Sequence, residues 1–220
     1  MLEVLYEDNH LIAINKKSGD IVQGDKTGDA PISDFIKGYI KAKYNKPGEV
    51  FLGTIHRLDR PTSGVMLFAR TSKALSRMNR QFKNKEVQKT YWAVVENAPP
   101  NQEGTLNNLL QKNEKKNKSY ITKGSQGKHA ILNYKLLKKL DNFYHLEIQP
   151  NTGRHHQIRV QLANIGCIIK GDLKYGAKRS NKNKSIHLLS RKIEFQHPVT
   201  KESITITAPI PKDNIWDACL

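Results

Sequence analysis

The chain has 220 residues, with 37 Lys and Arg against 20 Asp and Glu, so its formal net charge at neutral pH is +17. This length allows one large domain or two small ones with a real core. A protein this positive repels itself unless an anionic partner lies against it, with nucleic acid as the first candidate and an anionic membrane surface as the second.

Targeting, membrane and disulfide signals are missing from the sequence. The first eight residues are acidic and lack the basic and then apolar pattern of a signal peptide. No apolar run approaches the length that spans a bilayer. The two cysteines, Cys167 and Cys219, exclude a disulfide framework and a paired-thiolate metal site. We therefore expect a cytoplasmic protein in a reducing compartment, without membrane contact.

The start of the sequence predicts two short strands and a helix. Segments 4–6 and 11–15 have strand character and are separated by a polar turn. The Gly- and Asp-rich segment 24–29 has the chemistry of a loop. Pro31 then opens a helix. Its apolar stripe is expected to consist of Ile32, Phe35, Ile36 and Ile40.

A second helix follows an apolar strand at 65–69. Thr71 or Ser72 is expected to cap its N-terminus. Its buried face should consist of Leu75, Met78 and Phe82. Its other face carries Lys73, Arg77, Arg80 and Lys83. Such a face is either a solvated surface or a place where an anionic partner binds.

The rest of the sequence predicts mostly strands. Alternating apolar residues mark strands at 90–96, 129–137, 143–149, 186–189, 193–196 and 204–208. One further helix follows Thr152, carries Ile158, Leu162 and Ile165 on its apolar face, and is stopped by Gly166.

This order of elements favours an α+β fold, because hairpin-like strand pairs outnumber strand–helix–strand units. We predict one domain over residues 1–220, with a largely antiparallel mixed sheet flanked by helices. The Lys-rich segments 113–118 and 176–184 are expected to be exposed basic loops on this domain.

The ten-residue run from His56 to Val65 carries the strongest chemical signal. It places the Asp59 carboxylate between the guanidinium groups of Arg57 and Arg60, and it then turns into an apolar strand. A carboxylate that lies on a rigid turn and is kept ionised by adjacent cations is suited to act as a nucleophile or a base. Taken alone, an Asp in this context is more often a residue that stabilises the turn.

Further motifs follow the Asp59 run in a fixed order. They are the runs 89–94, 152–160, 171–176, 186–188 and 197–200, with sequences KTYWAV, TGRHHQIRV, GDLKYG, IHL and HPVT. Together with the Asp59 run, this ordered set resembles the RluA-type family of pseudouridine synthases. The resemblance covers nearly the whole chain, from Asn15 to Pro209.

The resemblance implies an activity, a fold and a set of site residues. The family isomerises chosen uridines in ribosomal or transfer RNA without a cofactor or a metal, by breaking the bond between the base and the sugar and rejoining the base through carbon. In the family, the aspartate that matches Asp59 is essential, and the residues that match Tyr91 and Arg159 complete the active site. An aliphatic residue that matches Ile186 packs nearby. The resemblance also implies the pseudouridine synthase fold, a monomer, and a catalytic domain without a separate S4-type RNA-binding domain.

The residue types suit this chemistry. An ionised Asp59 can attack the ribose or remove its 2′ proton, and the sequence does not choose between these roles. Arg159 would hold Asp59 deprotonated through a charge-assisted pair. Tyr91 would stack on a uracil that has been flipped out of the RNA and would assist proton transfer at the ring carbon.

Other basic residues are candidates for binding the RNA. We expect Arg57, Arg60, Lys89 and Arg154 to contact RNA near the target nucleotide, and the two basic loops to hold flanking phosphates. His156 is expected either to form a local hydrogen bond or to contact the RNA backbone. A metal site at His155 and His156 is rejected, because adjacent helical side chains point about 100° apart and no ligand trio lies nearby in sequence.

Two other classes of function compete with this hypothesis. One is a basic RNA-binding protein that keeps the scaffold without catalysis, but binding alone requires none of Asp59, Tyr91 and Arg159. The other is a glycoside hydrolase, which needs a second catalytic carboxylate. No carboxylate close to Asp59 in the sequence has a motif of its own, and such an enzyme has no need of a net charge of +17.

Overall fold

The computed structural model describes residues 2–22, 24 and 28–220. The chain forms two compact units, each built from separate segments of sequence. Unit 1 comprises Met1–Gln88 and Ser190–Pro209, and unit 2 comprises Lys89–Leu189 and Ile210–Leu220. The chain therefore passes from one unit to the other three times. Part of the predicted loop at 24–29 lies outside the described residues.

Unit 1 contains an antiparallel sheet. Its strands are β1 (Val4–Glu7), β2 (Leu11–Lys16), β3 (Gly53–Thr54), β4 (Ser63–Ala69), most of β10 (Leu188–Gln196) and β11 (Ser203–Thr207). The antiparallel pairs are β1 with β2, β2 with β4, β3 with β4, and β10 with β11. Strand β10 is continuous, although the sequence predicts two strands with a break before Ile193. The polar residues that suggested a break, Arg191 and Lys192, are half-buried positions within this strand.

The core of unit 1 lies around β2 and β4. Leu11, Ile12, Ala13 and Ile14 have no exposed surface, and neither does any residue of the segment 65–69. Both faces of these two strands are covered, which explains why their sequences are continuous apolar runs and do not alternate with polar residues. The loop that carries Asp59 leads directly into this rigid core at β4.

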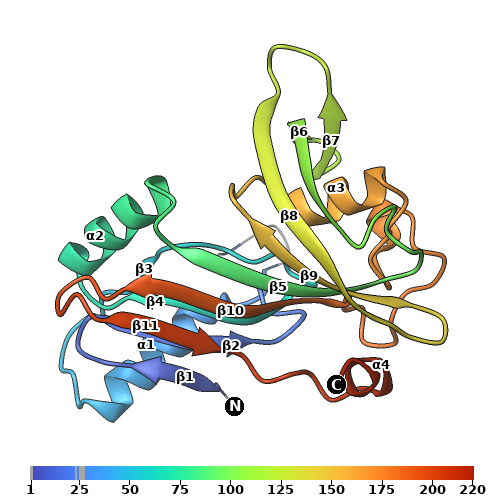
Figure 1. Ribbon diagram of the computed structural model, residues 1–220. Helices are drawn as coiled ribbons and strands as arrows, with labels where there is room; N and C mark the ends of the chain where they lie inside the picture. The colour runs from blue at the N-terminus through green and yellow to red at the C-terminus, as the bar shows by residue number, and fades with distance from the viewer. Residues whose placement is uncertain (1, 23, 25–27) are drawn as a thin grey trace. The chain divides into compact units, whose positions relative to one another are not determined.

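The described part of unit 1 contains two helices, as predicted. They are α1 (Ile32–Lys43) and α2 (Ser72–Lys83), shown in Figure 1. In α1, Ile32, Ile36 and Ile40 are buried, but Phe35 is 59% exposed, so its assignment to the buried stripe was wrong. Phe35 precedes Ile36 by one residue and therefore points about 100° away from it around the helix axis.

Helix α2 begins as the capping pattern predicts. The Thr71 hydroxyl accepts a hydrogen bond from the Ala74 backbone N–H at 3.1 Å. The fully buried side chains of α2 are Ala74, Met78 and Gln81. Leu75 and Phe82, which were expected on this face, are half-buried.

Unit 2 contains an antiparallel sheet of five strands in the order β5–β9–β8–β6–β7. The strands are β5 (Gln88–Val95), β6 (Glu103–Asn113), β7 (Lys118–Thr122), β8 (Lys128–Lys139) and β9 (Tyr144–Pro150). Strands β6 and β7 were not predicted. The sequence of β6 is mainly polar, with Thr105 as its one β-branched residue, so it gives little strand signal. Strand β7 contains Tyr120, Ile121 and Thr122, but it is only five residues long and begins in the segment expected to be a basic loop. The expected basic loop at 113–118 is the turn of this hairpin, and Figure 1 shows β6, β7 and one end of β8 as a projecting arm.

The arm is anchored on helix α3 (Gln157–Asn164), which ends as predicted at Gly166, where φ is +80°. Leu110 and Ala130 of the arm form a small buried cluster with Val160 of α3 and with Tyr175. Tyr175 belongs to a 3₁₀ turn, Leu173–Tyr175. A short helix that was not predicted, α4 (Asn214–Ala218), completes unit 2. Among the described residues, no helix is long and apolar enough to cross a membrane.

Candidate active site

Asp59 lies in unit 1 on a tight turn between β3 and β4. Its backbone carbonyl accepts a hydrogen bond from the Thr62 N–H at 3.0 Å, and the carbonyl of Arg60 accepts one from the Gly19 N–H at 2.9 Å. Asp59 itself is half-buried. The turn is therefore fixed both within itself and to the segment that follows β2.

A buried lysine lies beneath this turn. The side chain of Lys16, the last residue of β2, has no exposed surface. Its ammonium group donates to the carbonyl oxygens of Lys17 at 3.0 Å, Arg60 at 3.1 Å and Thr62 at 2.8 Å, and lies 3.4 Å from the carbonyl of Asp59. One ammonium group thus contacts four backbone carbonyls, three of which belong to the loop that carries Asp59. We infer that Lys16 is the residue that fixes the shape of this loop.

Burial lowers the pKa of Lys16 to about 8, while the carboxylates of Asp20 and Asp59 oppose this shift by attraction. The Lys16 ammonium and the Asp59 carboxylate therefore favour each other's charged forms. Because the folded pKa is below the unfolded pKa, the folded state binds fewer protons between these two values. The contribution of this group to stability consequently rises with pH from about pH 8 upward.

Replacing Lys16 with Met should separate the effect of this lysine on the conformation of the Asp59 loop from the free-energy cost of burying its charge. The variant leaves the loop carbonyls without a donor, but it also removes a buried charge, so we expect a loss of activity of about 10²-fold with a small change in stability. Urea unfolding at pH 7 and pH 9.5 should show wild-type stability rising by about 2 kcal/mol relative to Lys16→Met. Identical pH dependence in both proteins would contradict the burial of a charged lysine.

Gly64 explains one part of the sequence motif around Asp59. Its φ is +113°, and a Cβ at this position would lie 2.2 Å from the backbone carbonyl oxygen of Ser190 in β10. Only glycine combines this backbone conformation with so close an approach of another strand. The glycine at the end of the Asp59 run therefore lets β4 pass close to β10 and fixes the exit of the loop.

The start of the motif is fixed by His56. Its Nε2 accepts a hydrogen bond from the Leu67 backbone N–H at 3.0 Å, and its ring stacks on Phe82 of α2 with centroids 5.4 Å apart. The Asp59 loop is thus linked to helix α2 within the same unit.

The two arginines beside Asp59 both have exposed side chains. Arg60 forms an ion pair with Asp29 at 2.6 Å. An exposed pair of this kind contributes little to stability, and it can be exchanged for a contact with a phosphate. Arg57 and Arg60 therefore remain candidates for binding RNA.

In unit 2, the motif run 152–160 forms a turn and the start of α3, and the turn is hydrogen-bonded to strand β8. The Ile131 N–H donates to the Thr152 hydroxyl at 2.9 Å, and the Gln157 side chain donates to the Ile131 carbonyl at 3.0 Å. Gln157 Oε1 in turn accepts from the Arg154 N–H at 3.0 Å and from the Thr152 hydroxyl at 2.8 Å. The guanidinium of Arg154, an exposed residue, donates to the His129 carbonyl at 2.9 Å. These bonds fix the first residue of α3 and hence the direction of the residues that follow.

Arg159 is buried on α3, with 4% of its surface exposed. Its Nε lies 2.7 Å from one carboxylate oxygen of Asp172, and one terminal nitrogen lies 2.8 Å from the other oxygen. Asp172 is 1% exposed. This is a two-point ion pair in a dry environment, which holds the plane of the guanidinium in one orientation.

Tyr175 connects this ion pair to the arm. Its ring lies beneath the Arg159 guanidinium, at 5.2 Å from the ring centroid. Its hydroxyl accepts from the Ser119 N–H at 3.0 Å and lies 2.9 Å from Nδ1 of His156. His156 is buried and has a left-handed backbone, with φ of +54°. Of the two alternatives for His156, the local hydrogen bond is therefore present.

Lys89 and Tyr91 lie on the same face of β5, because side chains alternate along a strand. Tyr91 is 9% exposed and pairs in register with Ile148 of β9. Lys89 is half-buried, and burial lowers the pKa of its ammonium group. Ile186 is also buried. The strand expected at 186–189 begins only at Leu188 in the structure, as the start of β10, so Ile186 lies just before it.

The predicted site residues thus fall into two groups. Unit 1 holds Asp59, Arg57 and Arg60, and unit 2 holds Lys89, Tyr91, Arg154, His156, Arg159 and Ile186. Sequence reasoning did not assign a role to Lys16, Asp172 or Tyr175. Asp172 and Tyr175 lie in a motif run, which could have drawn attention to them, whereas nothing in the sequence distinguishes Lys16 from any other lysine at the end of an apolar strand.

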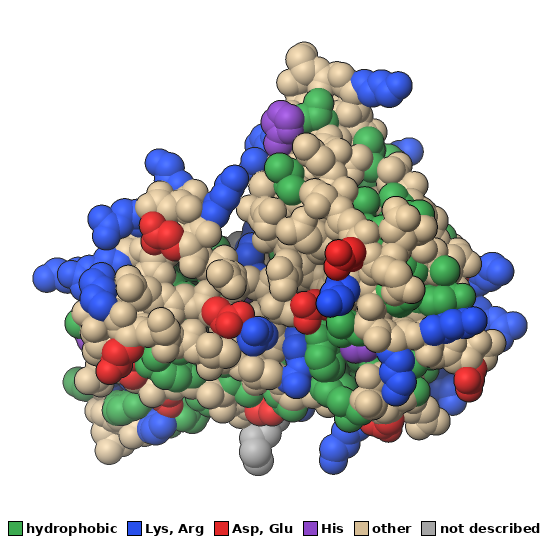
Figure 2. Space-filling view, viewed as in Figure 1, with side chains coloured by type: hydrophobic (Ala, Val, Ile, Leu, Met, Phe, Trp, Pro, Cys, Tyr) green, Lys and Arg blue, Asp and Glu red, His purple; other side chains and the backbone are tan. Residues whose placement is uncertain are grey.

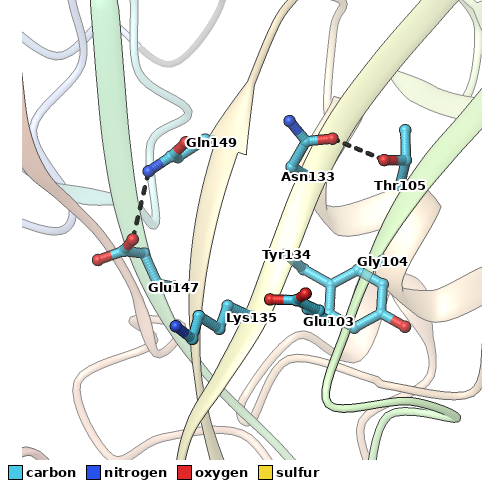
Figure 3. Close-up of a pocket in the computed structure, with 8 residues that line it drawn as sticks. All are labelled: Glu103, Gly104, Thr105, Asn133, Tyr134, Lys135, Glu147 and Gln149. Carbon is cyan, nitrogen blue, oxygen red and sulfur yellow. Dashed lines mark hydrogen bonds between the residues drawn. The ribbon is translucent and has the colours of Figure 1, made fainter.

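A separate cavity of about 410 Å³ lies on the sheet of unit 2 (Figure 3). It is lined by Glu103, Gly104, Thr105, Asn133, Tyr134, Lys135, Glu147 and Gln149. None of these is a predicted site residue. The lining contains two carboxylates, Glu103 and Glu147, and one lysine, Lys135. The cavity is therefore poorly suited to bind a phosphate. In the described part of the chain, no group of three or more potential metal ligands is present.

The family model described as RNA pseudouridylate synthase matches residues 10–164. An uncharacterized RNA pseudouridine synthase of Chlorobaculum parvum is 32% identical over 96% of this chain and 72% of its own length. The ribosomal large subunit pseudouridine synthase C of Vibrio vulnificus is 35% identical, and the tRNA pseudouridine synthase C of Haemophilus influenzae is 34% identical. The chain spans 65% of the length of the first of these two enzymes and 95% of the second.

Among solved structures, human RNA pseudouridylate synthase domain containing 4 superposes with a TM-score of 0.81 at 24% identity, over 99% of this chain and 91% of that chain. This likeness confirms the α+β fold. The match of the family model shows that the chain belongs to the RNA pseudouridylate synthase family. The protein is therefore an RNA pseudouridine synthase, an isomerase, and the resemblance seen in the sequence is confirmed.

Proposed function

We propose that this protein isomerises specific uridines in ribosomal or transfer RNA, with Asp59 as its catalytic carboxylate and with Tyr91 and Arg159 acting in the same reaction. One observation carries the proposal: all three residues lie inside the segment 10–164 that the family model matches, within the sequence runs on which the resemblance rests. The relatives named for ribosomal and for transfer RNA support both kinds of substrate.

The reaction requires no external reagent. The bond between C1′ of the ribose and N1 of uracil breaks, a bond between C1′ and C5 forms, and the proton lost from C5 is balanced by a proton gained at a ring nitrogen. Asp59 acts either on the ribose carbon or on its 2′ proton. Both roles need an ionised carboxylate in a fixed position, and the contacts of Lys16 beneath the loop support this requirement.

Within unit 2, the buried pair with Asp172 supports a role for Arg159 as an oriented cation for an anionic group. The low exposure of Tyr91 suits a ring that stacks on a flipped base at an apolar wall. Arg57, Arg60, Lys89 and Arg154 are proposed to bind the RNA around the target, and Ile186 to pack at the site. His156 is proposed to orient the start of α3 and, through it, the RNA backbone.

We also propose that the protein acts as a monomeric catalytic domain in the cytoplasm. Both cysteines are free, which suits a reducing compartment. Cys167 and Cys219 are buried, and burial raises the pKa of each to about 11, so neither is a reactive thiolate at neutral pH.

The test is to map pseudouridines across total RNA from a strain that lacks the gene and from its parent. We expect one or a few positions in ribosomal or transfer RNA to lose the modification. A plasmid copy of the wild-type gene should restore these positions, and a copy with Asp59→Asn should not. Unchanged modification in the deletion strain would contradict the proposed function.

A further inference from the structure

Positive charge in unit 1 is least neutralised on helix α2 and the turn after it. No Asp or Glu occurs between Asp59 and Glu86. The same segment contains the cations Arg60, Arg70, Lys73, Arg77, Arg80, Lys83 and Lys85. Figure 2 shows Lys and Arg side chains gathered over α2.

The cations on α2 form a continuous exposed surface. Lys73, Arg77, Arg80 and Lys83 are all exposed. At 100° and 1.5 Å per residue, the first three lie within about 60° of one another around the helix, and the four span about 15 Å along its axis. Short polar side chains lie among them, namely Ser72, Ser76, Asn79 and Asn84. We call this set the α2 surface.

These cations differ in their pairing from others in unit 1. Lys43 forms an ion pair with Glu7 at 2.6 Å, and Lys192 with Glu194 at 2.9 Å. In the part of the chain that the structure describes, Lys73, Arg80 and Lys83 make no such pair. Their charge is therefore available to a partner.

Part of this charge opposes the stability of the helix, although Arg80 and Lys83 lie in the last turn, where the helix dipole favours cations. Lys73 lies in the first turn, which contains no acidic residue, although the helix dipole favours negative charge there. Lys73 and Arg77 are four residues apart, and Arg77 and Arg80 are three apart, so like charges lie next to one another on one face. The repulsion between these like charges would be relieved by an anionic partner along this face.

The α2 surface is held on a rigid base. The Gln81 side chain donates to the Gln196 carbonyl at 2.8 Å, and the Arg77 guanidinium donates to the Pro198 carbonyl at 3.1 Å. Phe82 stacks on His56, three residues before Asp59. A ligand bound along α2 would thus be held by the same unit, and by the same packed elements, as the catalytic loop.

We propose that the α2 surface binds the phosphate backbone of the RNA segment that flanks the target uridine. This inference rests on the proposed function, and it assigns a part of the substrate to a surface that lies outside the catalytic motifs. Lys and Arg interleaved with Ser and Asn suit phosphate and 2′-hydroxyl groups. None of the large apolar side chains that are exposed lies on α2, whereas a protein partner would need an apolar centre.

The test uses the 220-residue chain with three charges removed from α2, as Lys73→Gln, Arg80→Gln and Lys83→Gln together. Arg77 is left intact because it bonds to Pro198. The matched control removes three charges from α1 and the turn after it, in the same unit, as Lys37→Gln, Lys41→Gln and Lys46→Gln. Binding of an RNA hairpin of about 16 base pairs is measured by fluorescence anisotropy over a series of salt concentrations. Circular dichroism melts confirm that both variants are folded.

We expect the α2 variant to bind at least about tenfold more weakly than the control variant. The slope of log K against log salt should fall by about one for each phosphate that the variant no longer neutralises, so by about 2 to 3 for the three substitutions, while the control slope should stay near that of the wild type. Equal weakening in both variants, or unchanged binding by the α2 variant, would overturn the inference. A protein that forms no pseudouridine but still binds RNA through the α2 surface would overturn the proposed function. The assignment of the α2 surface to RNA binding would then still hold.

Discussion

Asp59→Asn should abolish pseudouridine formation, with a loss of at least about 10³-fold in kcat. The amide has the shape of the carboxylate but carries no charge, and it can neither attack the ribose nor remove a proton. The Asp59 backbone carbonyl still bonds to Thr62 and lies near Lys16, so the loop should keep its conformation. The measurement is single-turnover conversion of an RNA that contains the mapped target uridine.

Binding distinguishes a chemical defect from a structural one in this variant. The affinity of Asp59→Asn for the same RNA should be equal to that of the wild type or slightly higher, since a negative charge near the phosphates has been removed. Asp34→Asn, an exposed position on α1, serves as the control and should retain full activity. Residual turnover within about tenfold of the wild type would show that Asp59 is not the catalytic group.

Asp172→Asn should have the largest effect on stability. It removes the negative charge of the carboxylate that pairs with the buried Arg159 guanidinium, and removing one partner of a buried pair costs about 3–5 kcal/mol. We expect a clear fall in Tm and a reduced denaturation midpoint in urea. Activity should fall as well, because the amide keeps only one of the two acceptor oxygens that orient Arg159.

The matched control is Asp29→Asn, which makes the same change in the exposed ion pair with Arg60. Exposed pairs contribute about 0–1 kcal/mol, so this variant should melt close to the wild type. Arg159→Lys provides a second comparison, since it keeps the charge but cannot form the two-point contact. It should be more stable than Asp172→Asn while its kcat remains low. Equal stability of Asp29→Asn and Asp172→Asn would contradict the buried pair.

Local sequence signals predicted the elements that carry strong periodicity. The apolar strands at β2 and β4, the Thr71 cap of α2 and the end of α3 at Gly166 all follow from local residue preferences. The hairpin β6–β7 did not, because its strands are stabilised by pairing with β8 and by packing on α3, both of which join segments that are distant in sequence.

The candidate site shows the same division. Asp59, Tyr91 and Arg159 could be named from motifs, because chemistry dictates the residue types at those positions. The residues that hold them could not, since a buried lysine that bonds to four carbonyls looks in sequence like any lysine at the end of a strand. Asp172 is thirteen residues from Arg159, and only the fold shows that the two form a pair.

The three crossings of the chain between its units have a consequence for synthesis. Strand β4 belongs to the core of unit 1, yet its neighbour β10 is translated only after residues 89–187. During translation the apolar β2–β4 pair must therefore wait with one edge uncovered, a condition that favours aggregation. A nascent chain interrupted before residue 188 would hold every proposed catalytic side chain and still lack strand β10, which completes the sheet of unit 1.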